Sequence, residues 1–301
     1  MSAHRAPLTS LLAAIDGIGY ARRMRIEFVK MQGLANDFLI FDAPAGLAGA
    51  PIDPGLMQAL ADRHTGVGFD QALMLEAPRQ PGHRAFYRVF NADGAEVEQC
   101  GNGARCVAAL LYARAPQRGR ELTMESKAGP VHACVRPDGS VSVDMGEPVF
   151  APAAIPLDAP AEALSYAVEV DGESVQLGAV SMGNPHAVLR VDDVKTAPVE
   201  RLGAAIERHP RFPRRANVGF MQVLEAGHIA LRVFERGVGE TLGCGTGACA
   251  AVAVGRRQGL LAPDVRVDLP GGTAEVSWGG GGEHAWLTGP AITVFSGIVD
   301  I

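Results

Sequence analysis

The chain has 301 residues, of which 48% are hydrophobic, so it is long enough for one large domain or two ordinary domains with buried cores. Its formal net charge is -6 and it has no concentrated basic stretch, which argues against a nucleic-acid partner. Glycine, proline and charged residues interrupt every apolar stretch before it reaches the roughly eighteen residues that a membrane helix needs. The composition therefore predicts a folded protein that binds neither nucleic acid nor membrane.

Residues 1–23 precede the first strand-like run and are interpreted as an N-terminal extension. Asp16 interrupts their short apolar patch and the small-residue cleavage pattern is poor, so no signal peptide is expected. The five cysteines are odd in number and unevenly spaced, which does not indicate a secreted disulfide framework. No CxxC or paired-histidine spacing predicts a metal site. Free thiols in a reducing cytoplasm are expected.

Alternation of apolar and polar residues predicts a series of short strands along the chain. Two other segments are apolar on nearly all faces, which is typical of a buried helix. They are RCVAALLYARA at 105–115 and ACAAVAVGRR at 248–257, and each follows a CGxGA sequence. The predicted strands, in chain order, are 25–33, 85–92, 122–129, 131–137, 140–145, 230–236, 265–270 and 291–301.

The two CGxGA sequences belong to a longer internal repeat. FNADGAEVEQCGNGA at 90–104 and FERGVGETLGCGTGA at 234–248 share six identities over fifteen ungapped positions, including Cys100 and Cys244. We also matched VGFDQ at 67–71 with VGFMQ at 218–222, and more weakly Asn36 with Asn184, since each asparagine opens a strand-like run. The same order of landmarks occurs twice.

A repeat of this kind predicts an α/β (α+β) fold with two similar halves related by pseudo-twofold symmetry. In each half, strands surround one central helix, with a cysteine at the helix N-terminus. We expect a first α/β domain at 24–146, completed by a C-terminal strand at 290–301, and a second α/β domain at 147–289. The boundary falls where the strand-like VSVDMGEPVF gives way to the Pro/Ala-rich APAAIPLDAPAEAL.

The paired cysteines point to proton transfer at a carbon centre. A glycine-rich turn opening a helix presents free backbone N–H groups and the positive end of the helix dipole, which favour a thiolate or bind a substrate carboxylate. Inversion of a carbon centre without a cofactor needs a base on one face and an acid on the other. A thiolate and a thiol, one from each half, can exchange these roles with the direction of the reaction.

The other candidate residues carry weaker signals. Cys106 and Cys249 lie on the apolar helices and are interpreted as buried structural thiols, while Cys134 is uninformative. Glu235 and Arg236 stand where the first repeat has Asn91 and Ala92. Because the side chain of a substrate must be recognised by groups that differ between the halves, Arg236 is a candidate to bind a second carboxylate in bidentate geometry.

These motifs closely resemble those of the diaminopimelate epimerase family over about residues 24–301. The matching sequences are GLANDF at 33–38, FDQ at 69–71, FNADG at 90–94, QCGNGARC at 99–106, GNPH at 183–186, ANVGF at 216–220, ERG at 235–237 and CGTGACA at 244–250. The resemblance implies an isomerase that interconverts LL- and meso-2,6-diaminopimelate by two-base proton transfer, with no cofactor and no metal. The reaction is a step toward lysine and peptidoglycan, and members of the family are homodimers.

The resemblance also assigns roles to individual residues. Cys100 and Cys244 are the implied acid and base, and His186 and Glu235 the residues that tune their ionisation. The implied substrate-binding residues are Asn36, Gln71, Asn91, Gly101, Asn102, Asn184, Asn217, Glu235, Arg236, Gly245 and Thr246. Departures from the family pattern are small: Ala35 replaces a usual glycine, and Leu242 and Gly243 precede Cys244 where the family varies. Neither departure is expected to touch a proposed contact.

Two alternatives remain open at this point. A racemase of the same fold acting on proline, hydroxyproline or histidine would also use two cysteines. Proline-type enzymes typically have a histidine two residues after the first cysteine, where this chain has Asn102, and Arg236 favours a substrate with a distal carboxylate. In a different class, the two cysteines would form a redox-switch disulfide in a non-catalytic binding protein, which would not catalyse exchange of an α-proton.

Overall fold

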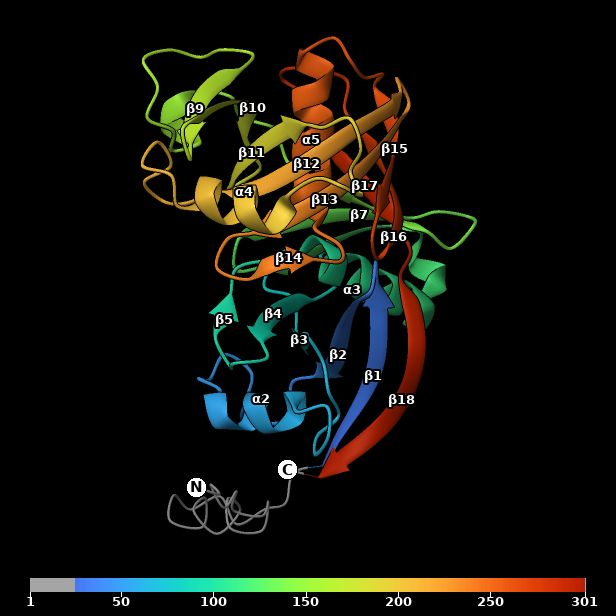
Figure 1. The fold of residues 1–301 in the computed structure, drawn as a ribbon. Helices are drawn as coiled ribbons and strands as arrows, with labels where there is room; N and C mark the ends of the chain where they lie inside the picture. Colours follow the sequence, from blue (N-terminus) through green and yellow to red (C-terminus); the bar gives the residue numbers. More distant parts are fainter. Residues whose placement is uncertain (1–24, 301) are drawn as a thin grey trace, which may run out of the picture.

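The computed structural model describes residues 25–300, so the predicted N-terminal extension lies outside the described residues. The chain folds into two α/β lobes, each with one helix enclosed by strands (Figure 1). The first series of elements is β1 (Arg25–Gly33), β2 (Asn36–Asp42), α2 (Pro54–Ala61), β3 (Gln71–Glu76), β4 (Phe86–Asn91), β5 (Glu96–Val97), α3 (Gly101–Arg114), β6 (Glu121–Ser126), β7 (Gly129–Val135), β8 (Val141–Asp144) and β9 (Tyr166–Val170).

The second series repeats this order. It consists of β10 (Glu173–Ser181), β11 (Pro185–Arg190), α4 (Val199–Glu207), β12 (Asn217–Glu225), β13 (His228–Glu235), β14 (Gly239–Thr241), α5 (Gly245–Arg257), β15 (Asp264–Leu269), β16 (Gly272–Ser277), β17 (Trp286–Gly289) and β18 (Ile292–Asp300). Two short 3-10 helices, η2 (Pro116–Arg118) and η3 (Pro152–Ala154), complete the described elements. The predicted α/β fold with two similar halves is confirmed.

Strand pairing follows the same scheme in both series. The pairs β1–β2 and β3–β4 are antiparallel and β2–β3 is parallel, and the corresponding pairs β10–β11, β12–β13 and β11–β12 have the same directions. The pairing of β8 with β17 joins strands of the two lobes in one sheet. Each central helix is therefore wrapped by an equivalent set of strands.

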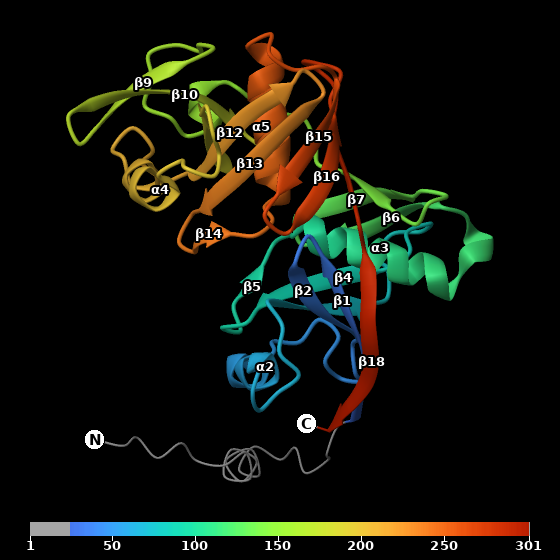
Figure 2. The same cartoon turned by 45° about the vertical axis from the view of Figure 1, so that its right-hand side comes forward.

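The last strand of each series pairs with the first strand of the other. β9 pairs with β10, and β18 runs antiparallel to β1, with Arg25 opposite Asp300 (Figures 1 and 2). The predicted strand at 291–301 thus lies beside the first strand of the chain. The domain boundaries at 146 and 289 stay a prediction. The pairs β9–β10 and β1–β18 each join the last strand of one series to the first strand of the other.

Strand register corrects one of the matches within the sequence repeat. Ala72 pairs with Phe90, and Val218 pairs with Phe234, so Gln71 occupies the position equivalent to Asn217. The match of VGFDQ with VGFMQ, which aligned Gln71 with Gln222, is therefore wrong. Residues 67–70 precede strand β3, whereas 218–222 lie inside β12, and glycine beside an apolar residue is common in both settings.

The two central helices are the cores of their lobes. Helix α3 contributes Ala104, Cys106, Val107 and Ala108 to one apolar cluster, all fully buried, and residues 248–253 of α5 are fully buried in another. Small side chains allow the surrounding strands to approach a helix on all sides. The prediction that Cys106 and Cys249 are buried thiols is confirmed. No helix within residues 25–300 has the length and hydrophobicity to cross a membrane.

Leu34 connects the two lobes. It lies in the two-residue turn between β1 and β2, yet it is 1% exposed and packs in the apolar cluster around α5. The tip of the β1–β2 hairpin of the first lobe is therefore anchored in the second lobe. The turn of this hairpin is followed directly by Asn36, one of the predicted site residues.

Candidate active site

The two cysteines occupy equivalent positions at the starts of the central helices. Cys100 is the N-cap residue of α3 and Cys244 that of α5, and both have extended backbone angles. The backbone N–H groups of Asn102 and Gly103 approach the Cys100 sulfur, and that of Gly247 approaches the Cys244 sulfur. Each sulfur thus lies against the unpaired N–H groups of a first helical turn, as the repeat predicted.

Burial opposes the effect of the helix N-termini on both thiols. It raises the pKa of Cys100 and raises the pKa of Cys244 more strongly, and the carboxylate of Glu235 raises both further. Our expectation that this environment favours the thiolate is therefore not met. Cys244 is 5% exposed and Cys100 is half-buried, so both sulfurs have lost much of the water that would stabilise a negative charge.

A chain of hydrogen bonds leads from His186 to Cys244. His186 Nε2 lies 3.0 Å from Asn184 Oδ1, Asn184 Nδ2 lies 3.4 Å from Thr246 Oγ1, and Thr246 Oγ1 lies 3.6 Å from Cys244 Sγ. If the imidazole donates to the asparagine, each following group accepts from one neighbour and donates to the next. The Thr246 hydroxyl then donates to the sulfur, which favours the thiolate.

His186 is neutral in this arrangement. It is 1% exposed, and burial together with the charge of Arg236 lowers the pKa of its imidazole from 6.5 to about 3. Asn217 Nδ2 also lies 3.4 Å from His186 Nε2, and this nitrogen cannot donate to Asn184 and accept from Asn217 at once. The shorter contact to Asn184 favours the donating tautomer.

Around Cys100, asparagine and glutamine side chains from β2, β3 and β4 gather at one edge of the sheet. Cys100 Sγ donates to Asn36 Oδ1 at 3.8 Å, and Gln71 Nε2 donates to Asn91 Oδ1 at 2.9 Å. Gln71 Oε1 is buried and accepts no hydrogen bond from the described residues. A buried acceptor of this kind is suited to a donor on a ligand, such as an ammonium group.

The second lobe carries charged residues at the positions equivalent to Asn91 and Ala92. Glu235 Oε1 accepts a hydrogen bond from Thr241 at 2.5 Å, and the backbone N–H of Arg236 donates to Asn217 at 2.8 Å. The guanidinium of Arg236 is exposed and donates to the carbonyl of Arg214 at 3.1 Å, and it forms no ion pair with a residue in 25–300. It is available to an external anion.

The two cysteine loops touch each other. Asn102 Nδ2 donates to the carbonyl oxygen of Gly243 at 2.9 Å, which contradicts our expectation that Gly243 touches no proposed contact. Close approach also explains one glycine, because a Cβ on Gly245 would lie 2.8 Å from Leu287 Cδ2 and 3.5 Å from Asn102 Oδ1.

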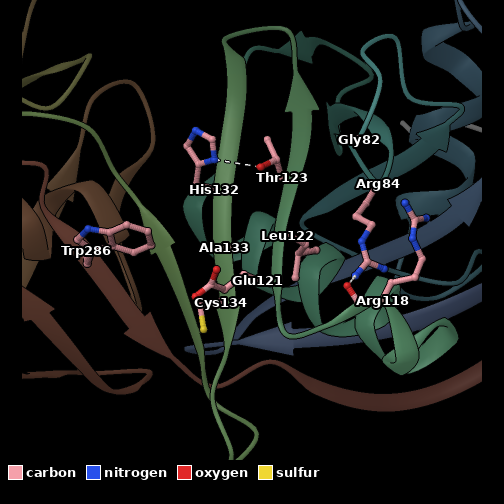
Figure 3. Close-up of a pocket in the computed structure, with 10 residues that line it drawn as sticks. All are labelled: Gly82, Arg84, Arg118, Glu121, Leu122, Thr123, His132, Ala133, Cys134 and Trp286. Atoms are coloured by element: carbon pink, nitrogen blue, oxygen red, sulfur yellow. Dashed lines mark hydrogen bonds between the residues drawn. The ribbon is translucent and has the colours of Figure 1, made fainter.

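A cavity of about 480 Å³ adjoins the cysteine loops, and Gly101, Asn184 and Thr246 are the predicted site residues that line it. Its volume is appropriate for a small-molecule ligand. A neighbouring cavity of about 400 Å³, which shares His132 with it, contains none of the predicted site residues (Figure 3). Cys134 on β7 lines this second cavity, together with Trp286 on β17 and Arg84 shortly before β4. In residues 25–300, no three His, Cys, Asp or Glu side chains converge as metal ligands would.

Two buried or paired residues near the site were not identified from the sequence. Asp70 accepts a hydrogen bond from Asn36 Nδ2 at 2.9 Å, and Arg105 donates to Asn102 Oδ1 at 2.8 Å. Both lie inside motifs that we quoted, FDQ and QCGNGARC. A charged residue inside a motif that is otherwise apolar or rich in amides was the feature of the sequence that could have identified both residues.

Comparison with known proteins agrees with the motifs. The model of the family described as "Diaminopimelate epimerase" matches residues 28–151 and 178–294. The chain belongs to the diaminopimelate epimerase family. It is 56% identical to the diaminopimelate epimerase of Thioalkalivibrio sulfidiphilus, over 92% of this chain and 100% of that protein, and 52% identical to that of Pseudomonas paraeruginosa, over 92% and 99%.

Solved structures with little sequence similarity share the fold. A hydroxyproline epimerase from Agrobacterium vitis has a TM-score of 0.66 at 16% identity, covering 93% of this chain and 94% of that one. A phenazine biosynthesis protein from Bacillus anthracis has a TM-score of 0.64 at 18% identity, covering 92% and 100%. The architecture is thus common to the diaminopimelate epimerase family and to proteins with other functions, so the fold alone does not specify a substrate.

Proposed function

We propose that this protein interconverts LL- and meso-2,6-diaminopimelate by moving the α-proton between Cys100 and Cys244. The observation that carries the proposal is the pair of thiols at equivalent helix N-termini of two repeated lobes, with their loops in contact through Asn102 and Gly243. Membership of the diaminopimelate epimerase family supplies the substrate.

The reaction begins with one sulfur protonated and the other deprotonated. The thiolate of one cysteine takes the α-proton, the C–H bond breaks, and the electron pair is delocalised into the adjacent carboxylate. The thiol of the other cysteine then protonates the planar carbon from the opposite face, which leaves this second sulfur as the thiolate. Reversal of the two roles gives the reverse reaction, so no external acid, base or redox partner is required.

Substrate binding is divided between backbone and side chains. The free N–H groups of the two first helical turns, at Gly101, Asn102, Gly245 and Thr246, suit the carboxylate at the reacting centre and the negative charge that develops there. The amide oxygens of Gln71 and Asn91 and the carboxylate of Glu235 suit the ammonium groups. The guanidinium of Arg236 suits the distal carboxylate, which proline lacks.

The experiment that tests this function is α-proton exchange in deuterated buffer with LL- and meso-diaminopimelate, followed by NMR and by analysis of the stereoisomers. We expect exchange together with interconversion of the two isomers, and no exchange with proline or hydroxyproline. Exchange with proline but not with diaminopimelate would assign the chain to a racemase of the other type. Reduced, folded protein without exchange on any of these substrates would reject the proposal.

We further propose a homodimer formed through β18. This strand pairs with β1, and its side chains Ile292, Val294, Phe295 and Ile298 are each about half exposed, at 49%, 55%, 47% and 48%. A row of exposed apolar side chains on an outer strand favours association with a second copy. Sedimentation should give a dimer for the native chain and a monomer for Phe295→Glu, and a native monomer would contradict the proposal.

We place the protein in the cytoplasm, where diaminopimelate serves lysine and peptidoglycan synthesis. All five cysteines are free, which fits a reducing compartment and a reaction that requires both thiols. Fractionation of cells that express the tagged chain would test this location, and recovery with a secreted marker would contradict it.

A further inference from the structure

Arg105 is a buried cation that has no carboxylate partner among residues 25–300. It is 0% exposed on helix α3, and buried arginine side chains are normally paired with acids. Among the described residues it donates through Nη2 to Asn102 Oδ1 at 2.8 Å and through Nε to the carbonyl oxygen of Pro290 at 3.5 Å, while Nη1 has no partner. Its positive charge is therefore not compensated by any ion pair in this part of the chain.

The guanidinium lies in a slot between the two lobes. A Cβ on Gly33, at the end of β1, would lie 2.9 Å from the carbonyl oxygen of Pro290 and 3.4 Å from Arg105 Nη2. A Cβ on Gly289, at the end of β17, would lie 3.2 Å from Arg105 Nε. Glycine at both positions lets the backbones close over the planar group. One lobe supplies the arginine and the other supplies part of its enclosure.

Arg105 also fixes the contact between the cysteine loops. Because Arg105 donates to Asn102 Oδ1, the amide nitrogen of Asn102 is directed to the Gly243 carbonyl oxygen, 2.9 Å away. Gly243 immediately precedes Cys244. The series Arg105, Asn102, Gly243 therefore links the start of α3 to the loop that holds the second cysteine.

The titratable groups that face Arg105 are thiols. They are Cys100 and Cys106 on its own helix and Cys249 on α5. The charged groups that act on Cys100 are Glu235 on β13 and Arg105, and Cys100 in turn raises the pKa of Tyr87 on β4. Burial raises the pKa of Cys100 most and Glu235 raises it further, whereas the guanidinium of Arg105 lowers it by a smaller amount. An unpaired cation in a site of reduced dielectric constant stabilises a nearby anion.

We propose that Arg105 is a positioning residue for the epimerisation, which holds the two cysteine loops together through Asn102 and supplies the buried positive charge that faces the reacting thiolate. The inference rests on the proposed two-thiol function. A purely structural arginine would affect stability but neither the ionisation of Cys100 nor the ratio of kcat to KM.

The test separates the hydrogen bond from the charge. Arg105→Gln keeps a donor for Asn102 and removes the charge, whereas Arg105→Lys keeps the charge and removes the planar fork. Arg114→Gln is the matched control, because Arg114 lies on the same helix and its ion pair with Asp42 is exposed. Two quantities are measured: the pH dependence of Cys100 alkylation by iodoacetamide, followed on the Cys100 peptide by mass spectrometry, and kcat and KM with diaminopimelate.

We expect Arg105→Gln to raise the alkylation midpoint by about one pH unit and to lower kcat about tenfold or more, with a smaller change in KM. Arg105→Lys should keep the midpoint and lose part of kcat, and Arg114→Gln should match the native chain. A folded Arg105→Gln protein with native midpoint and kcat would overturn the proposal, as would a loss of thermal stability alone.

A gentler variant covers the case in which no Arg105 substitution folds. Gly289→Ala leaves the charge in place but displaces the guanidinium by a few tenths of an ångström, since the new Cβ would lie 3.2 Å from Nε. It should lower kcat severalfold without a change in the alkylation midpoint, and native kcat would overturn the proposal. Alkylation of Cys100 needs no substrate, so failure of diaminopimelate turnover would reject the proposed function separately.

Discussion

The carboxylate of Asp70 accepts a hydrogen bond from the side-chain amide of Asn36 at 2.9 Å, and this contact decides which atom of Asn36 faces Cys100. With Nδ2 committed to Asp70, the carbonyl oxygen Oδ1 lies 3.8 Å from Cys100 Sγ and accepts from the thiol. Arg63 anchors Asp70 in turn through an ion pair of 2.7 Å. A carboxylate outside the reacting centre thereby sets the orientation of an amide within it.

Asp70→Asn is therefore expected to lower kcat/KM about tenfold, because a hydrogen bond to a charged acceptor contributes on the order of 1.5–3 kcal/mol and the replacement can present an N–H to Asn36. Steady-state kinetics with diaminopimelate measure the effect. Asp42→Asn is the control, since Asp42 makes only an exposed ion pair with Arg114. Equal rates for both variants would show that the orientation of Asn36 does not depend on Asp70.

Removal of either thiol should abolish inversion. We expect Cys100→Ser and Cys244→Ser each to lower the rate of interconversion at least 100-fold, since a hydroxyl is a far weaker base than a thiolate near neutral pH and general acid–base catalysis contributes about 10²- to 10⁴-fold. Cys134→Ser is the matched control, because Cys134 lies in the separate cavity of Figure 3. Full inversion by either single variant would exclude the two-thiol mechanism.

The sequence predicted the repeated architecture because the repeat consists of residues whose local structure is specific: a glycine-rich turn followed by an apolar helix. The glycines of CGxGA suit a helix that begins close to another loop, and the small apolar residues that follow suit a helix enclosed on all sides. These constraints act over a few positions, so Cys100 and Cys244 were found at the correct N-cap positions.

The charges and contacts that cross between lobes could not be predicted in the same way. The ionisation of the thiols depends on Glu235 and on burial, which are properties of the assembled site and not of either helix start. The contact of Asn102 with Gly243 joins positions 141 residues apart in the chain. The strand register was needed to show that Gln71 is equivalent to Asn217. A match of short apolar sequences does not specify which residues pair.

The buried His186 should make the stability of the fold depend on pH. Its pKa is about 3 in the folded protein and near 6.5 when exposed, so the unfolded chain binds a proton that the folded chain does not bind at intermediate pH. The stabilisation is fully present above pH 6.5 and is lost as pH falls toward 3, at up to about 1.4 kcal/mol per pH unit.

Urea midpoints measured from pH 7 down to pH 4 test this expectation. The native midpoint should fall more steeply than that of His186→Gln, which lacks the titrating group. His284→Gln is a control whose pH dependence has the opposite sign. The ion pair with Asp144 raises the pKa of His284, so its contribution to the free energy of unfolding is lost as pH rises. Parallel curves for the native chain and His186→Gln would show that the imidazole is not held neutral by burial.

Ala35 carries backbone strain beside the site. The turn between β1 and β2 has only two residues, Leu34 and Ala35, and both have positive φ angles, 57° and 59°. Two-residue hairpin turns of this type favour glycine, since a Cβ in the left-handed region costs on the order of 1–2 kcal/mol. Leu34 is retained by its burial in the second lobe, whereas the side chain of Ala35 is exposed.

Ala35→Gly should therefore stabilise the protein by roughly 0.5–1 kcal/mol, because relief of the strain exceeds the extra backbone entropy of glycine in the unfolded chain. Ala128→Gly is the matched control: Ala128 is also exposed in a two-residue hairpin turn, between β6 and β7, but its φ angle is not positive, so the same substitution should destabilise. Urea denaturation of the three proteins gives the comparison. A loss of stability in both variants would mean that the anchored hairpin imposes no strain at Ala35, and that the left-handed turn is determined by Leu34 alone.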